Sequence, residues 1–334
     1  MILVIGEALI DLIEERYSPG GFNAIVGGAN ANVAIALARR GTPQQFLGRI
    51  ANDRFGKIIR QRLVDNGVGL EFAISAKELT TLAVVSIDAS GVPSYAFYVN
   101  GTADWAWTKA ELPTNADLEH IHATAIQFGC LTMAMAPGNA VIEAWAREHF
   151  DQNSVTISHD INMRPALGFD AEFERERVER VNSISHIIKA SDEDIEWLYG
   201  LNHDDANTAS KIDEIVADWI DGTSRQVFVT RGSQGVSIYR NGEASETTRL
   251  DVPSRKINVV DTVGAGDTFC ANLLGQLSDL GALGTDPFDR LANLSDSVLE
   301  ELVRVAGVAA SIACERAGAE PPTKADLDAL LATL

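Results

Sequence analysis

Cysteine is scarce in this sequence, and its three cysteines do not pair by spacing. Cys130, Cys270 and Cys314 each stand alone in an apolar segment of the 334-residue chain. Zinc sites and disulfide frameworks use cysteines at short, repeated spacings. We therefore expect three reduced thiols that lie in the core.

Positive charge is also in short supply. Lys and Arg number 27 against 47 Asp and Glu, which gives a net charge of −20, and the basic residues do not cluster. Nucleic acid and anionic membranes are therefore not expected as partners. No stretch reaches the ~18 uninterrupted apolar residues of a membrane span. The N-terminal M-I-L-V-I-G-E lacks the basic start and long apolar run of a signal peptide, so we expect a cytoplasmic protein.

Two nucleotide-binding motifs are missing as well. The chain has no G-x-x-x-x-G-K-[ST], and no G-x-G-x-x-G after its first strand pattern, which argues against a P-loop and a dinucleotide Rossmann site. Hydrophobic residues make up 46% of the chain, enough for a large core. From about residue 122 onward, strand patterns alternate with helical ones. This alternation predicts an α/β fold with a doubly wound, mainly parallel sheet flanked by helices.

The domain organisation follows from length and patterning. The length suits a single domain over residues 1–334, since no extended linker or internal repeat divides it. Residues 82–87 and 94–100 flank D-A-S-G, which has hairpin chemistry. Together with earlier short segments they predict a small β lid, built from about residues 12–26 and 82–101.

The most informative stretch is V-V-D-T-V-G-A-G-D-T-F-C at residues 259–270. An apolar run leads into Gly264, Ala265, Gly266 and Asp267, and a helical pattern follows. N–H groups in a helix's first turn are unpaired and partly positive, so a phosphate fits there. A carboxylate beside that phosphate makes sense if it takes a proton from an attacking hydroxyl. The alternative is a glycine turn with an acidic helix start.

Two segments near the N-terminus carry candidate hydroxyl-binding groups. Asp11 closely follows the first strand pattern, and ligands of open α/β sheets bind near the carboxyl ends of strands. Gly27 and Gly28 precede a small-residue helix with Asn30 and Asn32. Carboxylate and amide groups suit sugar hydroxyls. A surface aspartate and an N-cap at Asn30 are the alternative interpretations.

Two later strand ends carry charged side chains. D-I-N-M-R places Asp160, Asn162 and Arg164 at alternate positions that could share a crevice, and the planar Arg164 cation suits phosphate. A salt bridge between Asp160 and Arg164 is the alternative. Ser191 and the acids after it have an N-cap pattern, and such acids could also order magnesium-bound water.

Together these segments resemble the ribokinase/PfkB family of carbohydrate kinases, and within it fructokinase-like members. D-T-V-G-A-G-D-T-F is similar to the family's C-terminal signature. G-G-x-x-x-N-x-A at Gly27–Ala34 and G-R-I-A-N-D-R-F-G at Gly48–Gly56 are similar to its N-terminal signature. K-A-S-D-E-D and V-T-R-G-S-Q-G also stand at family-like spacings. The resemblance covers essentially the whole chain.

The resemblance implies a ribokinase-like fold and transfer of the γ-phosphoryl group of MgATP to a sugar hydroxyl, which for fructose gives fructose 6-phosphate. By this resemblance Asp267 would be the catalytic base, and Gly264, Ala265 and Gly266 would form the anion hole. The sugar ligands would be Asp11, Gly27, Gly28 and Asn32. The nucleotide would contact Ser191, Thr230, Gly232 and Gly235, and its adenine would lie near Gly307. Arg164 would reach the phosphates or the sugar.

The resemblance also implies metal ions. The family commonly has N-x-x-E where this chain has S-D-E-D at residues 191–194, so Glu193 or Asp194 would order Mg²⁺ through water. Some members bind a monovalent cation such as K⁺ beside the anion hole. The matching positions are Asp261, Val263, Ala313, Arg316 and Gly318.

The acceptor sugar is left open by these motifs. 2-Keto-3-deoxygluconate kinase has a similar D-x-N-x-R, and ribokinase and nucleoside kinases are further alternatives within the family. A sugar- or nucleotide-binding protein without catalysis is the alternative from another class, although it would have little use for an acid beside a phosphate. The lid would also offer a surface for a homodimer.

Overall fold

A central sheet organises the chain. The computed structural model describes residues 1–15, 20–87, 93–242 and 246–334, and in them an eight-stranded sheet has the order β14-β13-β12-β11-β10-β9-β1-β4. Its strands are β1 (Ile2–Ile5), β4 (Gln44–Leu47), β9 (Ala125–Gly129), β10 (Thr156–Asp160), β11 (Ile187–Ser191), β12 (Gln226–Thr230), β13 (Val236–Asn241) and β14 (Thr247–Val252). All neighbouring strands from β4 to β12 pair in parallel, whereas β13 pairs antiparallel with both β12 and β14. The predicted mainly parallel sheet is confirmed.

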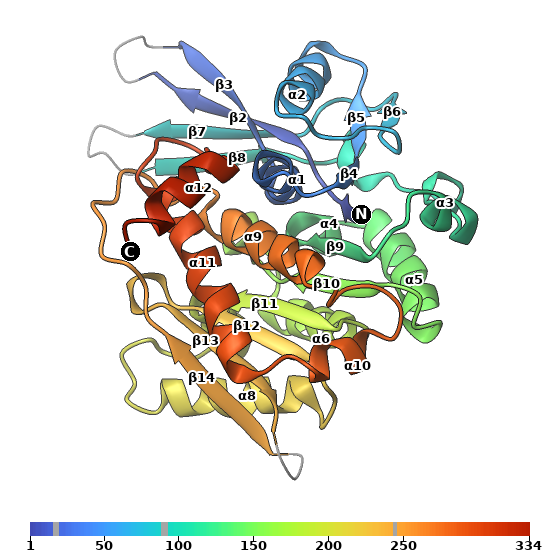
Figure 1. Ribbon diagram of the computed structural model, residues 1–334. Coiled ribbons are helices and arrows are strands. Elements are labelled where there is room, and N and C mark those ends of the chain that lie inside the picture. Colours follow the sequence, from blue (N-terminus) through green and yellow to red (C-terminus); the bar gives the residue numbers. More distant parts are fainter. Residues whose placement is uncertain (16–19, 88–92, 243–245) are drawn as a thin grey trace.

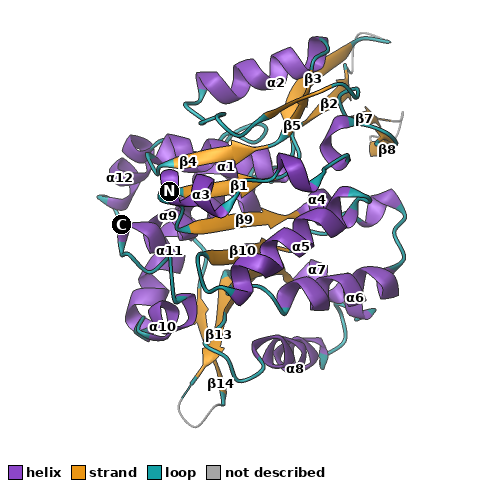
Figure 2. Cartoon of the chain, turned by 90° about the vertical axis from the view of Figure 1, so that its right-hand side faces the viewer, coloured by secondary structure: helices purple, strands orange, loops and turns teal. Residues whose placement is uncertain are grey.

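Helices cover both faces of this sheet, as a doubly wound fold requires (Figures 1 and 2). One layer holds α1 (Ala29–Arg40), α9 (Ala265–Asp279), α10 (Pro287–Ala292), α11 (Asp296–Cys314) and α12 (Lys324–Leu331). The other holds α4 (Cys130–Ala134), α5 (Gly138–Asp151), α6 (Ala171–Asn182), α7 (Asp192–Tyr199) and α8 (Thr208–Ile220). Also present are α2 (Arg54–Asp65), α3 (Asn115–His120) and the short turns η1 (Ala103–Trp105), η2 (Lys109–Glu111), η3 (Pro165–Leu167) and η4 (Gly232–Gln234).

The short apolar strand β1 shows why the sequence folds this way. Ile2 and Val4 pack in the cluster that includes α1, α9 and α11. Leu3 and Ile5 point to the opposite face and pack with α5. A strand with helices on both sides buries every side chain, so it reads as an unbroken apolar run. None of the described helices is long and apolar enough to cross a membrane.

A smaller sheet stands beside the main one, at the top of Figure 1. Its strand order is β3-β2-β7-β8, with β2 (Leu9–Glu14), β3 (Phe22–Gly27), β7 (Leu82–Ile87) and β8 (Pro93–Tyr98). A pair of short strands, β5 (Arg49–Ala51) and β6 (Ile74–Ala76), lies nearby. The smaller sheet overlaps the segments expected to form a lid, although its part in closing a site stays a prediction.

The cysteines agree with the expectation of reduced thiols. All three are free; Cys130 and Cys270 are buried and Cys314 is half-buried. Burial raises the pKa of the Cys314 thiol, which keeps it protonated and weakly reactive near neutral pH.

Two neighbouring strands hold a buried ion pair. Asp160 and Lys189 are register partners on β10 and β11, and Lys189 Nζ lies 3.0 Å from Asp160 Oδ1. Burial raises the pKa of Asp160, which the Lys189 cation opposes. Burial acts to lower the pKa of Lys189, but attraction to Asp160 makes the net direction upward. A contact this short favours the charged form of both groups. The alternative interpretation, a salt bridge between Asp160 and Arg164, is therefore wrong, because Asp160 pairs with Lys189.

We expect Lys189→Met to lower the free energy of unfolding by about 3–5 kcal/mol, because it leaves a buried carboxylate without its partner. Urea denaturation at neutral pH measures this loss. The double variant Lys189→Met with Asp160→Asn removes both charges and should recover much of it. Lys109→Met is the matched control, since Lys109 pairs with Glu148 in solvent and such pairs contribute about 0–1 kcal/mol. Equal effects at the two lysines would contradict the interpretation.

Candidate active site

Asp267 lies in the first turn of α9, at the sheet edge where the parallel strands end. It is 5% exposed, and Gly264 forms the N-cap with a φ of 75°. The helix's positive end favours an acid in this turn. Burial raises the pKa of Asp267, while a hydrogen bond from Asn32 and the cations Arg164 and Lys189 oppose that rise.

Two amide side chains hold the Asp267 carboxylate. Asn32 Nδ2, from α1, donates to Oδ2 at 2.9 Å, and Asn162 Nδ2, from the loop after β10, donates to Oδ1 at 3.2 Å. Asn32 was predicted as a sugar ligand, and its contact with Asp267 had no signal in the sequence. Each carboxylate oxygen still has a second lone pair for another donor.

The glycines around Asp267 are required by close approach. A Cβ on Gly264 would lie 2.7 Å from Ala319 Cβ, and one on Gly266 would lie 2.9 Å from Lys189 Nζ. Helices leave their first N–H groups without intrahelical partners; here the N–H of Ala265 donates to the Thr262 carbonyl at 3.2 Å. The glycines of the predicted anion hole therefore lie next to the buried ammonium group of Lys189.

Asp11 projects from β2 in the smaller sheet and is half-buried. Burial raises its pKa to about 6, against the effect of the nearby Arg164 cation. A Cβ on Gly27 would lie 2.2 Å from Asp11 Oδ2, so glycine leaves the space that this carboxylate fills. Gly28 has a φ of 107°, and its Cβ would lie 2.5 Å from the Glu7 carbonyl oxygen.

Glu7 fixes the glycine loop in place and was missed in the sequence. Its carboxylate accepts the Ala29 N–H and the Asn30 Nδ2–H, both at 2.9 Å, and the Thr132 hydroxyl. Asn30 Nδ2 also donates to the Gly129 carbonyl at 3.1 Å. The N-cap of α1 is Gly28, so the expected cap at Asn30 was wrong. The available signal for a role of Glu7 was its place two residues after the end of the buried strand β1.

The loop after β10 brings Arg164 to the site. Arg164 Nη1 donates to Asn162 Oδ1 at 2.5 Å, to the Asn162 carbonyl at 3.2 Å and to the Met163 carbonyl at 2.9 Å. Because Arg164 acts on the pKa of both Asp11 and Asp267, it lies close to the two predicted functional acids.

The acids after β11 are placed differently from one another. Asp194 accepts the Met163 N–H at 2.7 Å and the Ser191 N–H at 2.8 Å, while Ser191 caps α7 by accepting from the Asp194 N–H. Each Asp194 oxygen is thus already engaged by the backbone. Glu193 is exposed. Among the described residues no group of three or more His, Cys, Asp or Glu could hold a metal ion.

The predicted nucleotide contacts lie on neighbouring strand ends. Ser191 and Thr230 are register partners at the ends of β11 and β12. Gly232 and Gly235 follow β12 with positive φ of 48° and 101°, and a Cβ on Gly235 would lie 2.1 Å from the Val252 carbonyl oxygen. Gly307 lies on α11, where a Cβ would have no neighbour within 4 Å.

The predicted monovalent-cation positions are joined by hydrogen bonds in two groups. Asp261 Oδ1 accepts the Val263 N–H at 3.0 Å, and its Oδ2 accepts the Gly318 N–H at 2.8 Å. The Arg316 N–H donates to the Ala313 carbonyl at 3.0 Å. Residues more than 50 positions apart in the sequence therefore meet beside the start of α9.

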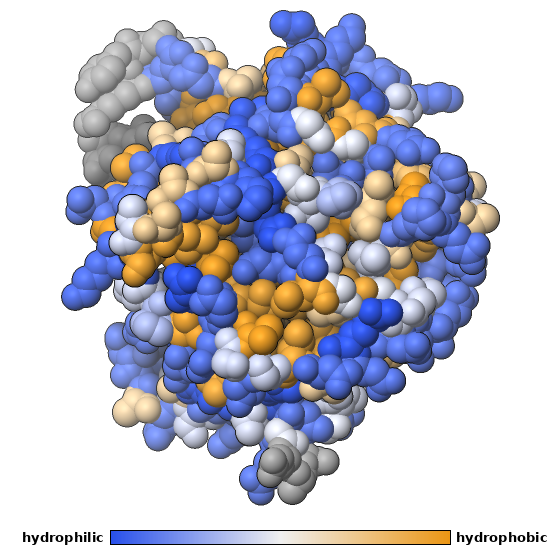
Figure 3. Space-filling model, in the orientation of Figure 1, coloured by the Kyte–Doolittle hydropathy of each residue, from blue (hydrophilic) through white to orange (hydrophobic). Residues whose placement is uncertain are grey.

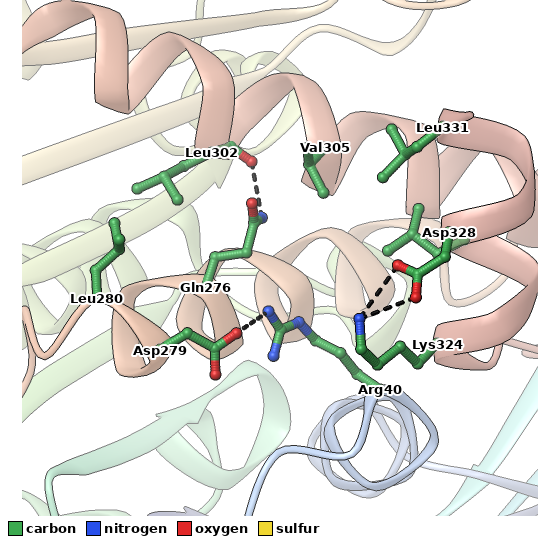
Figure 4. A pocket seen from close by; sticks show the side chains of 10 residues that line it. Arg40, Gln276, Asp279, Leu280, Leu302, Val305, Lys324, Asp328 and Leu331 are labelled. Carbon is green, nitrogen blue, oxygen red and sulfur yellow. Dashed lines mark hydrogen bonds and ion pairs between the residues drawn. The ribbon is translucent and has the colours of Figure 1, made fainter. Parts of the chain in front are cut away.

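A groove of about 310 Å³ lies at the opposite end of α9 and holds none of the predicted site residues. It is lined by Arg40, Gln276, Asp279, Leu280, Leu302, Val305, Lys324, Leu327, Asp328 and Leu331 (Figure 4). From Asp267 to Asp279 the helix rises by about 18 Å. Apolar atoms gather around α9 and α11 on this face of the molecule (Figure 3), and ion pairs between Arg40 and Asp279 and between Lys324 and Asp328 border the groove.

Comparison with known proteins gives one consistent result. The pfkB family carbohydrate kinase model matches residues 1–326. A fructokinase of Rhizobium leguminosarum bv. trifolii is 36% identical over 279 residues, which cover 83% of this chain and 79% of the relative. Fructokinase-1 of Oryza sativa subsp. japonica is 31% identical, with 99% and 96% of the two chains covered.

The solved structures agree with the sequence relatives. The crystal structure of a fructokinase from Xylella fastidiosa with bound ATP has a TM-score of 0.85 and 25% identity, and covers 99% of this chain and 98% of that one. The family model, the relatives and the similar structure agree on one class of protein, the carbohydrate kinases. The chain belongs to the pfkB family of carbohydrate kinases, as its motifs indicated.

Proposed function

We propose that this carbohydrate kinase is an ATP-dependent fructokinase. Asp267, a buried carboxylate at a glycine-lined helix N-terminus and held by two amides, is the observation that carries the proposal. The names of the relatives support fructose as the acceptor, and the bound ATP of the similar Xylella fastidiosa structure supports ATP as the donor.

The proposed reaction needs positioning and charge stabilisation more than covalent help. The 6-hydroxyl oxygen of fructose attacks the γ-phosphorus of ATP, and the bond from that phosphorus to the β,γ-bridging oxygen breaks. Asp267 accepts the hydroxyl proton as the new bond forms. N–H groups of Gly264, Ala265 and Gly266 stabilise the charge on the phosphoryl oxygens, with the Ala265 N–H exchanging its bond to the Thr262 carbonyl for one to the phosphoryl group. The products are fructose 6-phosphate and ADP, and Asp267 then returns its proton to solvent.

Magnesium bound with ATP would neutralise charge on the phosphates. Of the two predicted acids, we assign its water ligand to Glu193, because the Asp194 oxygens already accept the Met163 and Ser191 N–H groups. For K⁺ we propose the segments around Asp261, whose backbone carbonyls are oxygen ligands that hard cations take, while the Asp261 carboxylate holds the segments together through the Val263 and Gly318 N–H groups. Ser191, Thr230, Gly232, Gly235 and Gly307 are the proposed nucleotide contacts.

Asp11, Gly27, Gly28 and Asn32 are the proposed sugar ligands, with the smaller sheet as a lid. A lid over the sugar would exclude water, which otherwise competes as acceptor. We also propose that a second copy of the chain packs on this sheet. Phe22 and Tyr98 are exposed on one face of this sheet, on its two edge strands, and Ile25 is exposed on the other face; the face with Phe22 and Tyr98 is the one we propose for the contact.

Acceptor choice is tested by ADP release in a coupled assay with Mg²⁺ and ATP, with and without K⁺. The acceptors are fructose, 2-keto-3-deoxygluconate, ribose and a nucleoside. We expect the highest kcat/KM with fructose. A much better acceptor would reject the fructokinase assignment, and calorimetric sugar binding without ADP release from any acceptor would favour a protein that binds without catalysis.

We expect Asp267→Asn to lower kcat by roughly 10²–10⁴-fold, because the hydroxyl proton loses its acceptor. Fructose binding by calorimetry should change little. Asp151→Asn is the matched control, since Asp151 is exposed at the end of α5. A kcat of Asp267→Asn close to that of the wild type would contradict the role of Asp267 as the catalytic base.

The raised pKa of Asp11 predicts a pH-dependent sugar affinity. Asp11 accepts sugar hydroxyls when ionised, and its pKa is raised to about 6, so KM for fructose should rise as pH falls through about 6. Asp11→Asn should show a high KM at every pH, without this step. The measurement is KM across pH 5–8, roughly the range around that pKa. An unchanged wild-type KM below pH 6 would contradict the role.

A further inference from the structure

Asn162 contacts the proposed base and lies outside every predicted functional role. Its Nδ2 donates to Asp267 Oδ1 at 3.2 Å, across a sequence distance of 105 residues. Asn32 donates to the other oxygen at 2.9 Å. The carboxylate is therefore held from two different elements, α1 on one side and the loop after β10 on the other.

The amide of Asn162 is fixed in one orientation. Arg164 Nη1 donates to Asn162 Oδ1 at 2.5 Å, and a guanidinium can only donate. The oxygen must therefore face Arg164, and the NH₂ group must face Asp267. A cation on the amide oxygen also polarises the amide and strengthens its N–H donor.

The backbone at Asn162 is held in a conformation that few residues adopt. Its φ is 41°, in the left-handed region where asparagine is tolerated better than most side chains. Arg164 also bonds the Asn162 carbonyl at 3.2 Å, and Asp194 accepts the N–H of Met163 at 2.7 Å. Both bonds act on the peptide group that joins Asn162 to Met163, and they help to maintain this conformation.

We propose that Asn162 is a positioning residue for the base, and that Arg164 acts on Asp267 through it. This inference rests on the proposed role of Asp267 as base. The amide keeps one carboxylate oxygen in place and favours its ionised form, so Asp267 stays aimed at the acceptor hydroxyl when the sugar arrives.

Other charged and titratable groups also face Asp267 and stay in place in the test. They are Glu7, Cys130, Asp160, Arg164, Lys189 and Cys270. Removing the Asn162 amide takes away one donor to the carboxylate while these groups remain. The pKa of Asp267 should then rise, and the acidic limb of the kcat–pH profile should move to higher pH.

Asn162→Gly is the decisive variant, since glycine adopts the left-handed conformation freely and only the amide is lost. We expect kcat to fall by about 10–100-fold, as for a displaced catalytic group, with KM for fructose little changed and the acidic limb moved upward. Asn162→Asp keeps the side-chain size and places a second carboxylate beside Asp267. The acidic limb of its kcat–pH profile should therefore move to still higher pH. Asn153→Gly is the control, because Asn153 is exposed with a φ of 49°.

The outcomes separate the inference from the proposed function. A wild-type kcat and an unmoved acidic limb in folded Asn162→Gly, with Asp267→Asn inactive, would overturn the positioning role alone. Full activity in Asp267→Asn would overturn the base itself. If Asn162→Gly lowers the melting temperature, kcat is referred to the folded fraction from circular dichroism, and an unmoved limb in both Asn162 variants still refutes the proposal.

Discussion

A carboxylate and the proposed anion site share one helix start in this protein, and much of the surrounding structure keeps the carboxylate away from the N–H groups. The positive end of α9 favours Asp267 in its first turn and equally favours a phosphate. If the carboxylate turned onto the N–H groups, it would occupy the anion's place. Asn32 and Asn162 instead hold it to the side. Asn32 lies on α1, which packs against α9, and Asn162 closely follows β10, which lies inside the central sheet.

The same constraint explains the glycines and the buried cation below them. Side chains at Gly264 and Gly266 would come too close to Ala319 and Lys189, so the helix start lies directly against these two residues. Lys189 adds positive charge near the anion site, but an unpaired ammonium could not be buried. Asp160 supplies its counter-charge from the neighbouring strand. The ion pair therefore fits both a stable sheet and a site for anions.

Much of this arrangement was predictable from sequence, because it depends on local patterns. The apolar run of β1 predicts a strand buried on both faces, and the glycines before Asp267 predict a bare helix start. The partners of these residues were not predictable. Asn32 and Asp267 are 235 positions apart, and Asn30 bonds Glu7 instead of capping its helix.

Intermediate cases show where the limit of sequence reasoning lies. A lysine inside the apolar strand I-I-K-A signals that some buried acid must pair with it. Which acid does so depends on strand order and register, and these are set by the packing of the whole sheet. From spacing alone, a salt bridge between Asp160 and Arg164 was one of two open interpretations. Spacing within one loop suggested Arg164 as a partner of Asp160, whereas the register of β10 and β11 places Lys189 opposite Asp160.

The charges around Arg164 influence which sugar binds as acceptor. The start of α9 cannot make this choice, because any hydroxyl could be activated there. Arg164 lies near two carboxylates, Asp11 and Asp267, while Lys189 is already paired with Asp160. A neutral sugar leaves this balance unchanged. A sugar acid such as 2-keto-3-deoxygluconate would bring a third carboxylate beside Arg164, and like charges in a desolvated site oppose binding. The electrostatics of the crevice therefore favour a neutral acceptor such as fructose, and the smaller sheet that carries Asp11 is where that preference would be changed.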